Sequence, residues 1–267
     1  MAVSAPASFW HSLGIQRRVV FALLMREVIT RYGRHNIGFL WLFVEPMMFT
    51  LGVTALWSLS KIAHGTSSSL SVAAFAMTGY SSILVWRNTV LRCTTAITPN
   101  LSLMYHRNVR VIDIFASRIM LEIAGASISF VVLTLGFTAL RWVEPPADIL
   151  KVLFGWTMLA WFGAALALTI GAASELSELV EKIWHPLSYL LFPLSGVAFM
   201  VDWLPPHIRE MLLWVPMVNG LEILREGYFG GTVTAHYDAD YLAVFCLCLT
   251  FFGLALARIA GRHVEPQ

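Results

Sequence analysis

The chain has 267 residues, of which 58% are hydrophobic and 13% are charged, and its mean hydropathy is +0.71. Soluble domains contain about 45–50% apolar and about 25% charged residues, so this composition excludes an ordinary soluble protein and indicates an all-α integral membrane protein. The net charge of +2 says little by itself, and we expect no nucleic-acid partner.

The first predicted element is an amphipathic helix over residues 19–36 that lies at the membrane interface. Apolar side chains at helical spacing, among them Phe21, fall on one face, and Arg26, Arg31 and Arg34 fall on the other. A helix with this pattern lies in the plane of the lipid headgroups rather than across the bilayer.

Six segments are apolar enough to be transmembrane helices, although the second is the weakest because it contains Ser81, Ser82 and Arg87. In the fourth, Gly163 and Gly171 are two helical turns apart with a small residue between them, which indicates a face for close helix packing. The predicted spans cover residues 37–60, 72–91, 114–140, 150–173, 183–200 and 241–260.

Two of these spans contain acidic residues. Glu45 directly precedes Pro46 in the first span, and an intramembrane carboxylate beside a helix breaker is a candidate functional group. The alternative is that the helix begins near Pro46 and that Glu45 lies among the headgroups. Glu122 follows Arg118 by one helical turn in the third span, so an intrahelical ion pair could lower the cost of both charges.

Residues 204–229 are nearly apolar enough to enter a membrane but are too broken to cross one. Pro206 can begin a short helix that Pro216 ends, and Asn219 can cap a second helix with Glu222 in the capping-box position. Each helix reaches about 15 Å, whereas the hydrocarbon core is about 30 Å thick. This predicts a re-entrant helix pair before the last span, with two helices lying on the bilayer surface as the alternative.

The positively charged residues indicate the orientation. Six spans place both ends of the chain on one side of the membrane, and 13 of the 18 Lys and Arg residues then lie on that side. The positive-inside rule therefore predicts that both termini are cytoplasmic and that the re-entrant pair is at the outer face.

Other functional classes have little support. The cysteines Cys93, Cys246 and Cys248 form no metal-binding or redox pattern, and the eight histidines are scattered, so we expect no metal site and no membrane enzyme. There is no GxxxxGK motif, so the chain itself should bind no ATP and needs no cofactor. The first 16 residues lack the pattern of a cleavable signal peptide. A channel or secondary transporter, the remaining alternative, could use Glu45 and Glu122 as ion or proton sites.

Three blocks of residues carry a resemblance to a known family over nearly the whole chain. They are Leu23–Val28 with Thr30–Gly33, Gly38–Trp41 and Glu45-Pro46; Asn100–Asp113 with Ser117-Arg118 and Leu121-Glu122; and Leu212–Trp214 with Pro216, Leu221-Glu222 and Arg225-Glu226. Together with the order of elements, they resemble the membrane subunits of type-II ABC exporters, in particular the capsular-polysaccharide export permeases (the KpsM-like family). Asn108 and Val111 depart from the pattern, since family members often have proline there, and this leaves the start of the coupling element open.

The resemblance implies a homodimer that works with two copies of a separate ATP-binding subunit, which would bind ATP and Mg. The implied cargo is a lipid-linked anionic polysaccharide, moved across the bacterial inner membrane through a conduit at the homodimer interface. Capsule systems also imply a periplasmic co-polymerase and an outer-membrane channel. Within the family, the alternative cargoes are O-antigen, teichoic acid, a small lipid or a drug.

Four groups of candidate site residues follow from the resemblance and from side-chain chemistry. Coupling to the ATP-binding subunit is expected in the segment 101–112, which carries Leu103, Tyr105, His106, Arg107 and Arg110. Contact with the cargo head group is expected at Arg26, Arg31 and Arg34. The conduit should be lined by Trp41, Phe43, Glu45 and Tyr80, and the outer gate should contain Glu222, Arg225 and Glu226.

Each group has a simpler alternative. The segment 101–112 could be basic only because it faces the cytoplasm, and the arginines of the first helix could anchor it to anionic lipid. Most aromatic side chains of a membrane protein face lipid or the headgroup region. Glu222 and Arg225 lie within one turn and could pair with each other, with another segment or with a second subunit.

Overall fold

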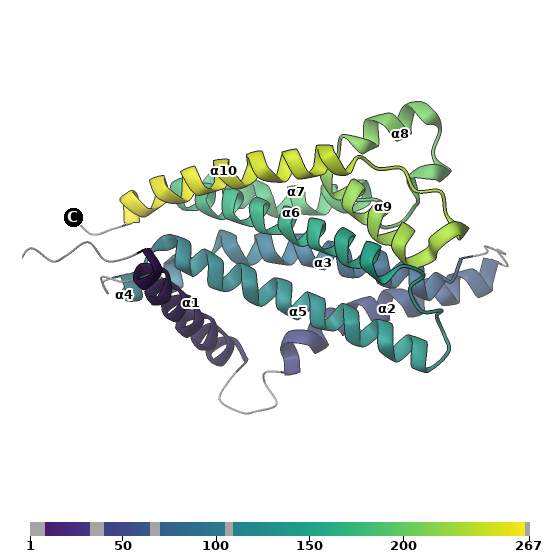
Figure 1. The fold of residues 1–267 in the computed structure, drawn as a ribbon, viewed down its shortest axis with the longest axis horizontal. Helices are drawn as coiled ribbons and strands as arrows, with labels where there is room; N and C mark the ends of the chain where they lie inside the picture. Colours follow the sequence, from purple (N-terminus) through teal and green to yellow (C-terminus); the bar gives the residue numbers. More distant parts are fainter. Residues whose placement is uncertain (1–8, 33–39, 65–69, 105–108, 265–267) are drawn as a thin grey trace, which may run out of the picture.

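The computed structural model describes residues 9–32, 40–64, 70–104 and 109–264, which fold into helices and turns with no β-strand among them (Figure 1). This confirms the predicted all-α class. The α-helices are α1 (Phe9–Tyr32), α2 (Trp41–His64), α3 (Val72–Thr94), α4 (Leu101–Met104), α5 (Val111–Ala139), α6 (Ile149–Leu176), α7 (Glu178–Leu194), α8 (Pro206–Leu213), α9 (Pro216–Phe229) and α10 (Ala239–Val264).

The long helices form an elongated bundle with α1 and α4 near one end and α8 and α9 toward the other (Figure 1). We call these the α1 end and the α9 end. By length and composition α5, α6 and α10 could each cross a membrane, and α2 contributes a shorter apolar stretch, Val44–Leu59. The arrangement of six spans with a re-entrant pair stays a prediction.

Helix α6 lies at the centre of the bundle, where it packs against α3, α9 and α10. The small residues in this helix allow the close approach that their spacing predicted. A Cβ atom on Gly163 would lie 2.9 Å from Trp86 Cα, and one on Gly171 would lie 2.8 Å from a ring carbon of Phe115. Larger side chains at either position would therefore push α3 or α5 away from α6.

Several helix boundaries differ from the predicted ones. Helix α1 begins at Phe9, ten residues before the predicted interface helix, and α2 begins at Trp41, so that Pro46 lies inside the helix. Helix α7 begins at Glu178 and ends at Leu194, whereas the fifth span was expected over residues 183–200. The turn after Leu194 frees backbone carbonyl groups that α9 uses.

The capping prediction for α9 is wrong. Pro216 begins this helix, and Asn219 lies within its first turns rather than at the N-cap. Proline is favourable at the first helical position because its missing N–H would have no partner there. The Asn219 side chain instead donates to the carbonyl of Leu213 (2.8 Å) and accepts from the backbone N–H of Asp238 (2.8 Å), which ties α9 to the segments before it and after it.

Candidate functional site

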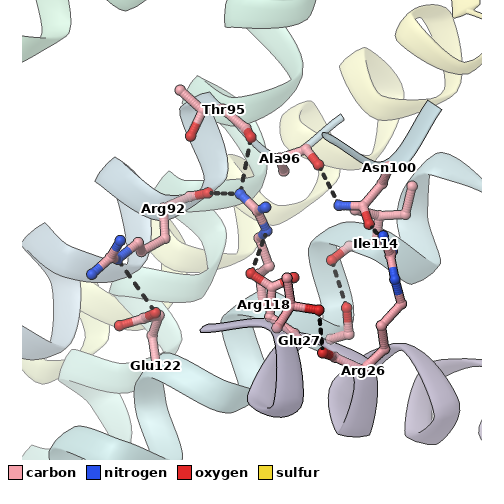
Figure 2. Close-up of polar contacts among 11 residues, drawn as sticks. Arg26, Glu27, Arg92, Thr95, Ala96, Asn100, Ile114, Arg118 and Glu122 are labelled. Atoms are coloured by element: carbon pink, nitrogen blue, oxygen red, sulfur yellow. Dashed lines mark hydrogen bonds and ion pairs between the residues drawn. The ribbon is translucent and has the colours of Figure 1, made fainter. Parts of the chain in front are cut away.

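At the α1 end, Arg118 of α5 joins three helices (Figure 2). One guanidinium nitrogen donates to the carbonyls of Arg92 (2.6 Å) and Thr95 (3.0 Å), where α3 ends. Its Nε lies 3.3 Å from a carboxylate oxygen of Glu27 on α1. A cation is favourable here because the last carbonyl groups of a helix lack partners and carry partial negative charge.

The partner of Arg118 was not predicted from the sequence. A pair between Arg118 and Glu122 on the same helix stays a prediction, whereas Arg118 binds Glu27 of α1 and Glu122 lies 3.8 Å from Arg92 of α3. Arg92 is also 4.0 Å from Glu45 of α2, so its guanidinium lies near two carboxylates from different helices. These contacts connect α1, α2, α3 and α5.

Helix α1 also holds both flanks of the segment expected to contact the ATP-binding subunit. Arg26 donates to the side-chain oxygen of Asn100, which in turn donates to the carbonyl of Ala96 (Figure 2). Nearer its start, Gln16 of α1 donates to Asp113 (3.0 Å) in the first turn of α5. These contacts tie α1 to the segment before residue 101 and to the segment after residue 110.

The predicted coupling residues lie largely outside the described residues. Tyr105, His106 and Arg107 lie there, as does the side chain of Leu103. Arg110 is exposed and precedes α5, where its backbone N–H donates to the carboxylate of Asp113 (3.0 Å). Their coupling role stays a prediction.

Of the residues expected to contact the cargo head group, only Arg26 has a described side chain, and Asn100 engages its guanidinium. The side chain of Arg31 and all of Arg34 lie outside the described residues. The contact with cargo stays a prediction, and it requires Arg26 to exchange an internal partner for an external one.

The predicted conduit residues separate into two environments. Trp41 and Glu45 are exposed on α2, whereas Tyr80 of α3 is buried inside the protomer. The Tyr80 ring packs against Trp57 of α2, at 5.5 Å between centroids, and Phe192 of α7, at 5.6 Å. Phe43 belongs to α2, but its side chain lies outside the described residues.

At the α9 end, Arg225 is fully buried and binds the turn that follows α7. Its guanidinium donates to the carbonyls of Gly196, Val197 and Phe199, each at 2.7 Å. It also lies 3.9 Å from the centroid of the Phe75 ring. Gly196 has a positive φ of 81°, a conformation that favours glycine, and it turns the chain so that these carbonyls converge.

Glu222 is also buried, and among the described side chains it makes no direct ion pair with Arg225, so the pairings left open for these two charges stay predictions. Its two carboxylate oxygens accept from the backbone N–H groups of Val201 and His236, each at 3.2 Å. The two charged residues therefore face opposite kinds of backbone group, and each holds a different loop against α9.

Glu226, the third predicted gate residue, pairs with Lys151 at the start of α6 (3.0 Å). A hydrogen bond to Glu226 raises the pKa of Tyr237, because it stabilises the protonated hydroxyl. The three predicted gate residues thus each fix α9 to a different neighbour, and their role in gating stays a prediction.

The sequence model described as ABC-2 type transporter matches residues 18–229. The chain is 46% identical over 260 residues to the capsule polysaccharide export inner-membrane protein CtrC of Neisseria meningitidis serogroup B, and 44% identical to BexB of Haemophilus influenzae, which has the same descriptive name; in both cases 97% of each chain is covered. It is 26% identical to the polysialic acid transport protein KpsM of Escherichia coli, over 91% of this chain and 94% of KpsM.

Proposed function

The chain belongs to the ABC-2 type transporter family, and from this premise we propose that it is the transmembrane subunit of an ATP-driven exporter of capsular polysaccharide. The observation that carries the proposal is the 46% identity that extends over 97% of both chains to a capsule polysaccharide export inner-membrane protein. Similarity over the full length supports a shared cargo class as well as a shared fold.

ATP hydrolysis belongs to a separate subunit in this proposal. The sequence contains no P-loop, so two copies of an ATP-binding partner would bind ATP and Mg. The segment 101–112 would contact that partner. The bonds from Arg26 to Asn100 and from Gln16 to Asp113 support this role, because a displacement of the segment must also move α1.

Arg118 can transmit a displacement of α1 to the helices of the bundle. It is buried between the end of α3, α5 and Glu27 of α1, so these helices can shift together as one unit at the α1 end. Shifts of packed helices are a common form of conformational change in proteins because closely packed interfaces do not deform continuously.

The conduit would lie at the interface of a homodimer. Helix α2 supports this, since it has exposed Trp41, Met48 and Phe49 on the same helix as Glu45. Aromatic rings can stack on the apolar faces of sugars without requiring one hydroxyl pattern, which suits a long repeating polymer. Glu222, Arg225 and Glu226 would keep α9 rigid at the outer end of that conduit.

The chain would cross the bacterial inner membrane six times with both termini in the cytoplasm, and its relatives CtrC and BexB are named as inner-membrane proteins. The lipid-linked polysaccharide would pass to a periplasmic co-polymerase and then to an outer-membrane channel.

The test is complementation of an encapsulated bacterium from which the homologous permease gene has been deleted. This chain, expressed with its own ATP-binding subunit, should restore polysaccharide at the cell surface, measured separately from polysaccharide inside the cell. A Walker-motif lysine variant of the ATP-binding subunit is the control and should leave the polymer inside. Polymer that stays inside with the intact complex would refute the proposal.

A further inference from the structure

A groove of about 470 Å³ lies between the first turns of α2 and the second half of α3. Its lining includes the aromatic side chains of Trp41 and Phe49, the carboxylate of Glu45 and two neighbouring polar residues of α3, Arg87 and Asn88. An aromatic, acidic, amide and cationic group thus meet in a part of the chain that is otherwise mostly apolar.

Arg87 is partly buried and differs from the two buried arginines of the bundle, Arg118 and Arg225. Arg118 and Arg225 each have three described partners. Arg87 has a buried Nε atom, yet among the described residues its guanidinium makes no hydrogen bond and no ion pair. The guanidinium instead makes a cation–π contact with the ring of Tyr189 on α7, with its central carbon 4.4 Å from the ring centroid.

Asn88 likewise lacks a polar partner among the described residues. Within the described ranges its side-chain amide has no hydrogen-bond partner, and the residue is partly exposed. A guanidinium without a counter-charge is costly inside a membrane, and such groups usually face a partner or an aqueous path. The stacking on Tyr189 holds the guanidinium in place without satisfying its N–H donors.

The geometry points to this groove as a loading subsite for one anionic glycosyl unit, a sugar that bears a carboxylate or phosphate group. Arg87 binds the anion, because a planar guanidinium donates two parallel hydrogen bonds to it. Asn88 and Glu45 bind sugar hydroxyls, and Trp41 and Phe49 cover an apolar face of the ring. The inference rests on the proposed function and specifies which part of the cargo this site recognises.

Two features favour a sugar over the phosphate of a membrane phospholipid. Glu45 repels any anion in the groove, but a sugar offsets this repulsion with hydroxyl groups that donate to the carboxylate, and a phosphodiester has none to donate. In addition, the ring of Phe49 packs against the ring of Tyr80, at 5.7 Å between centroids, so α3 holds Phe49 in place at the groove. An aromatic ring held in this way can cover the apolar face of a sugar, and a phosphodiester has no such face.

The test uses the complex with its ATP-binding subunit in lipid nanodiscs and a photoactivatable octyl glucuronide, which has one acidic sugar. Mass spectrometry should find the label on peptides that contain residues 41–49 or 84–88. Unlabelled octyl glucuronide should compete at concentrations about tenfold lower than octyl glucoside, which lacks the charge, or octyl phosphate, which lacks the sugar.

Arg87→Gln should lower labelling about tenfold, because it removes the charged half of the contact. Arg258→Gln is the matched control, since Arg258 is an exposed arginine on α10, and its labelling should equal that of the wild type. If Arg87→Gln does not assemble with the ATP-binding subunit, Asn88→Ala replaces it and should lower labelling about threefold, the loss of one neutral hydrogen bond.

Labelling that is unchanged in these variants, or absent because a second copy of the chain covers the groove, would overturn the inference. Competition by octyl phosphate equal to that by octyl glucuronide would also overturn it and would identify a phospholipid headgroup site. The proposed function fails separately, if the wild-type chain does not restore surface polysaccharide. When export is restored but the groove is not labelled, only the loading subsite is rejected.

Discussion

The carboxylate of Glu27 on α1 lies 3.3 Å from Nε of Arg118 on α5. Because Arg118 also binds the carbonyls at the end of α3, this one pair connects the predicted interface helix to two helices of the bundle. Both side chains are largely buried, so neither can exchange its partner for water without cost.

We expect Arg118→Met to lower the free energy of unfolding by about 3–5 kcal/mol, because it leaves a buried carboxylate and two carbonyls without their donor. Glu27→Gln should cost about 1–2 kcal/mol, since an amide oxygen can still accept a hydrogen bond. Thermal unfolding of the purified complex measures both. The control is Glu178→Gln, which breaks the exposed pair with Lys182 and should change stability little.

A charge exchange tests whether Arg118 acts only through Glu27. The double variant Glu27→Arg, Arg118→Glu restores opposite charges but places a carboxylate against the carbonyls of Arg92 and Thr95. Export and stability should therefore stay low. Full recovery would show that the bonds to the end of α3 contribute nothing.

Coupling through the segment 101–112 predicts a specific defect. Replacing Tyr105 and Arg107 by alanine should leave membrane insertion and ATP hydrolysis by the complex intact and should abolish most export, because the segment no longer engages the ATP-binding subunit. Surface polysaccharide and ATPase activity measured on the same preparation decide the point. Export equal to the wild type would contradict the coupling role.

Recognition of the cargo head group by α1 can be separated from simple anchoring by Arg→Lys substitutions. Lysine keeps the charge, so anchoring to anionic lipid should survive Arg31→Lys, whereas bidentate binding of a phosphate or carboxylate should not. We expect export to fall severalfold with unchanged membrane insertion. Arg26→Lys serves as a comparison, because its bond to Asn100 makes it a structural residue as well.

At the α9 end, Arg225→Met should be among the most destabilising substitutions in the chain. It leaves the carbonyls of Gly196, Val197 and Phe199 without a donor, at a cost of about 3–5 kcal/mol. Protease sensitivity of the turn after α7 measures the loss. Lys151→Met breaks only the partly exposed pair with Glu226 and should have a much smaller effect.

The sequence predicts well those features that depend on local pattern. Apolar runs predict the helices, and the small residues of α6 predict its close packing, because both follow from composition and spacing. Partners of buried charges could not be predicted in the same way. Arg118 has an acidic residue one turn away but binds Glu27, which is 91 positions earlier, and the choice depends on how α1 packs against α5.

For the same reason, the partners of the buried charges at the α9 end could not be predicted. Glu222 and Arg225 have suitable spacing for a pair, but a turn after α7 supplies three carbonyls to Arg225, and two backbone N–H groups come to Glu222 from other loops. The contacts that Gln16 and Asn100 make with charged side chains were also not predicted. In the sequence these two polar residues look like solvated ones, and only their positions in the fold bring them to Asp113 and Arg26. A charge inside an apolar run, such as Arg87, is a signal that the sequence does contain.

Tyr80 and Phe49 together test whether the aromatic rings of α2 and α3 line the path of the polymer. Tyr80 is buried, so Tyr80→Ala should cost about 3–5 kcal/mol by leaving a cavity among its aromatic neighbours, and Tyr80→Phe should restore both stability and export. Phe49 is 47% exposed, so Phe49→Ala should change thermal unfolding little. If the exposed ring contacts the polymer, Phe49→Ala should nevertheless lower surface polysaccharide severalfold at constant protein level, and Phe49→Trp should restore it. Normal export by Phe49→Ala, with a loss only in Tyr80→Ala, would mean that these rings stabilise the protomer and do not line the path.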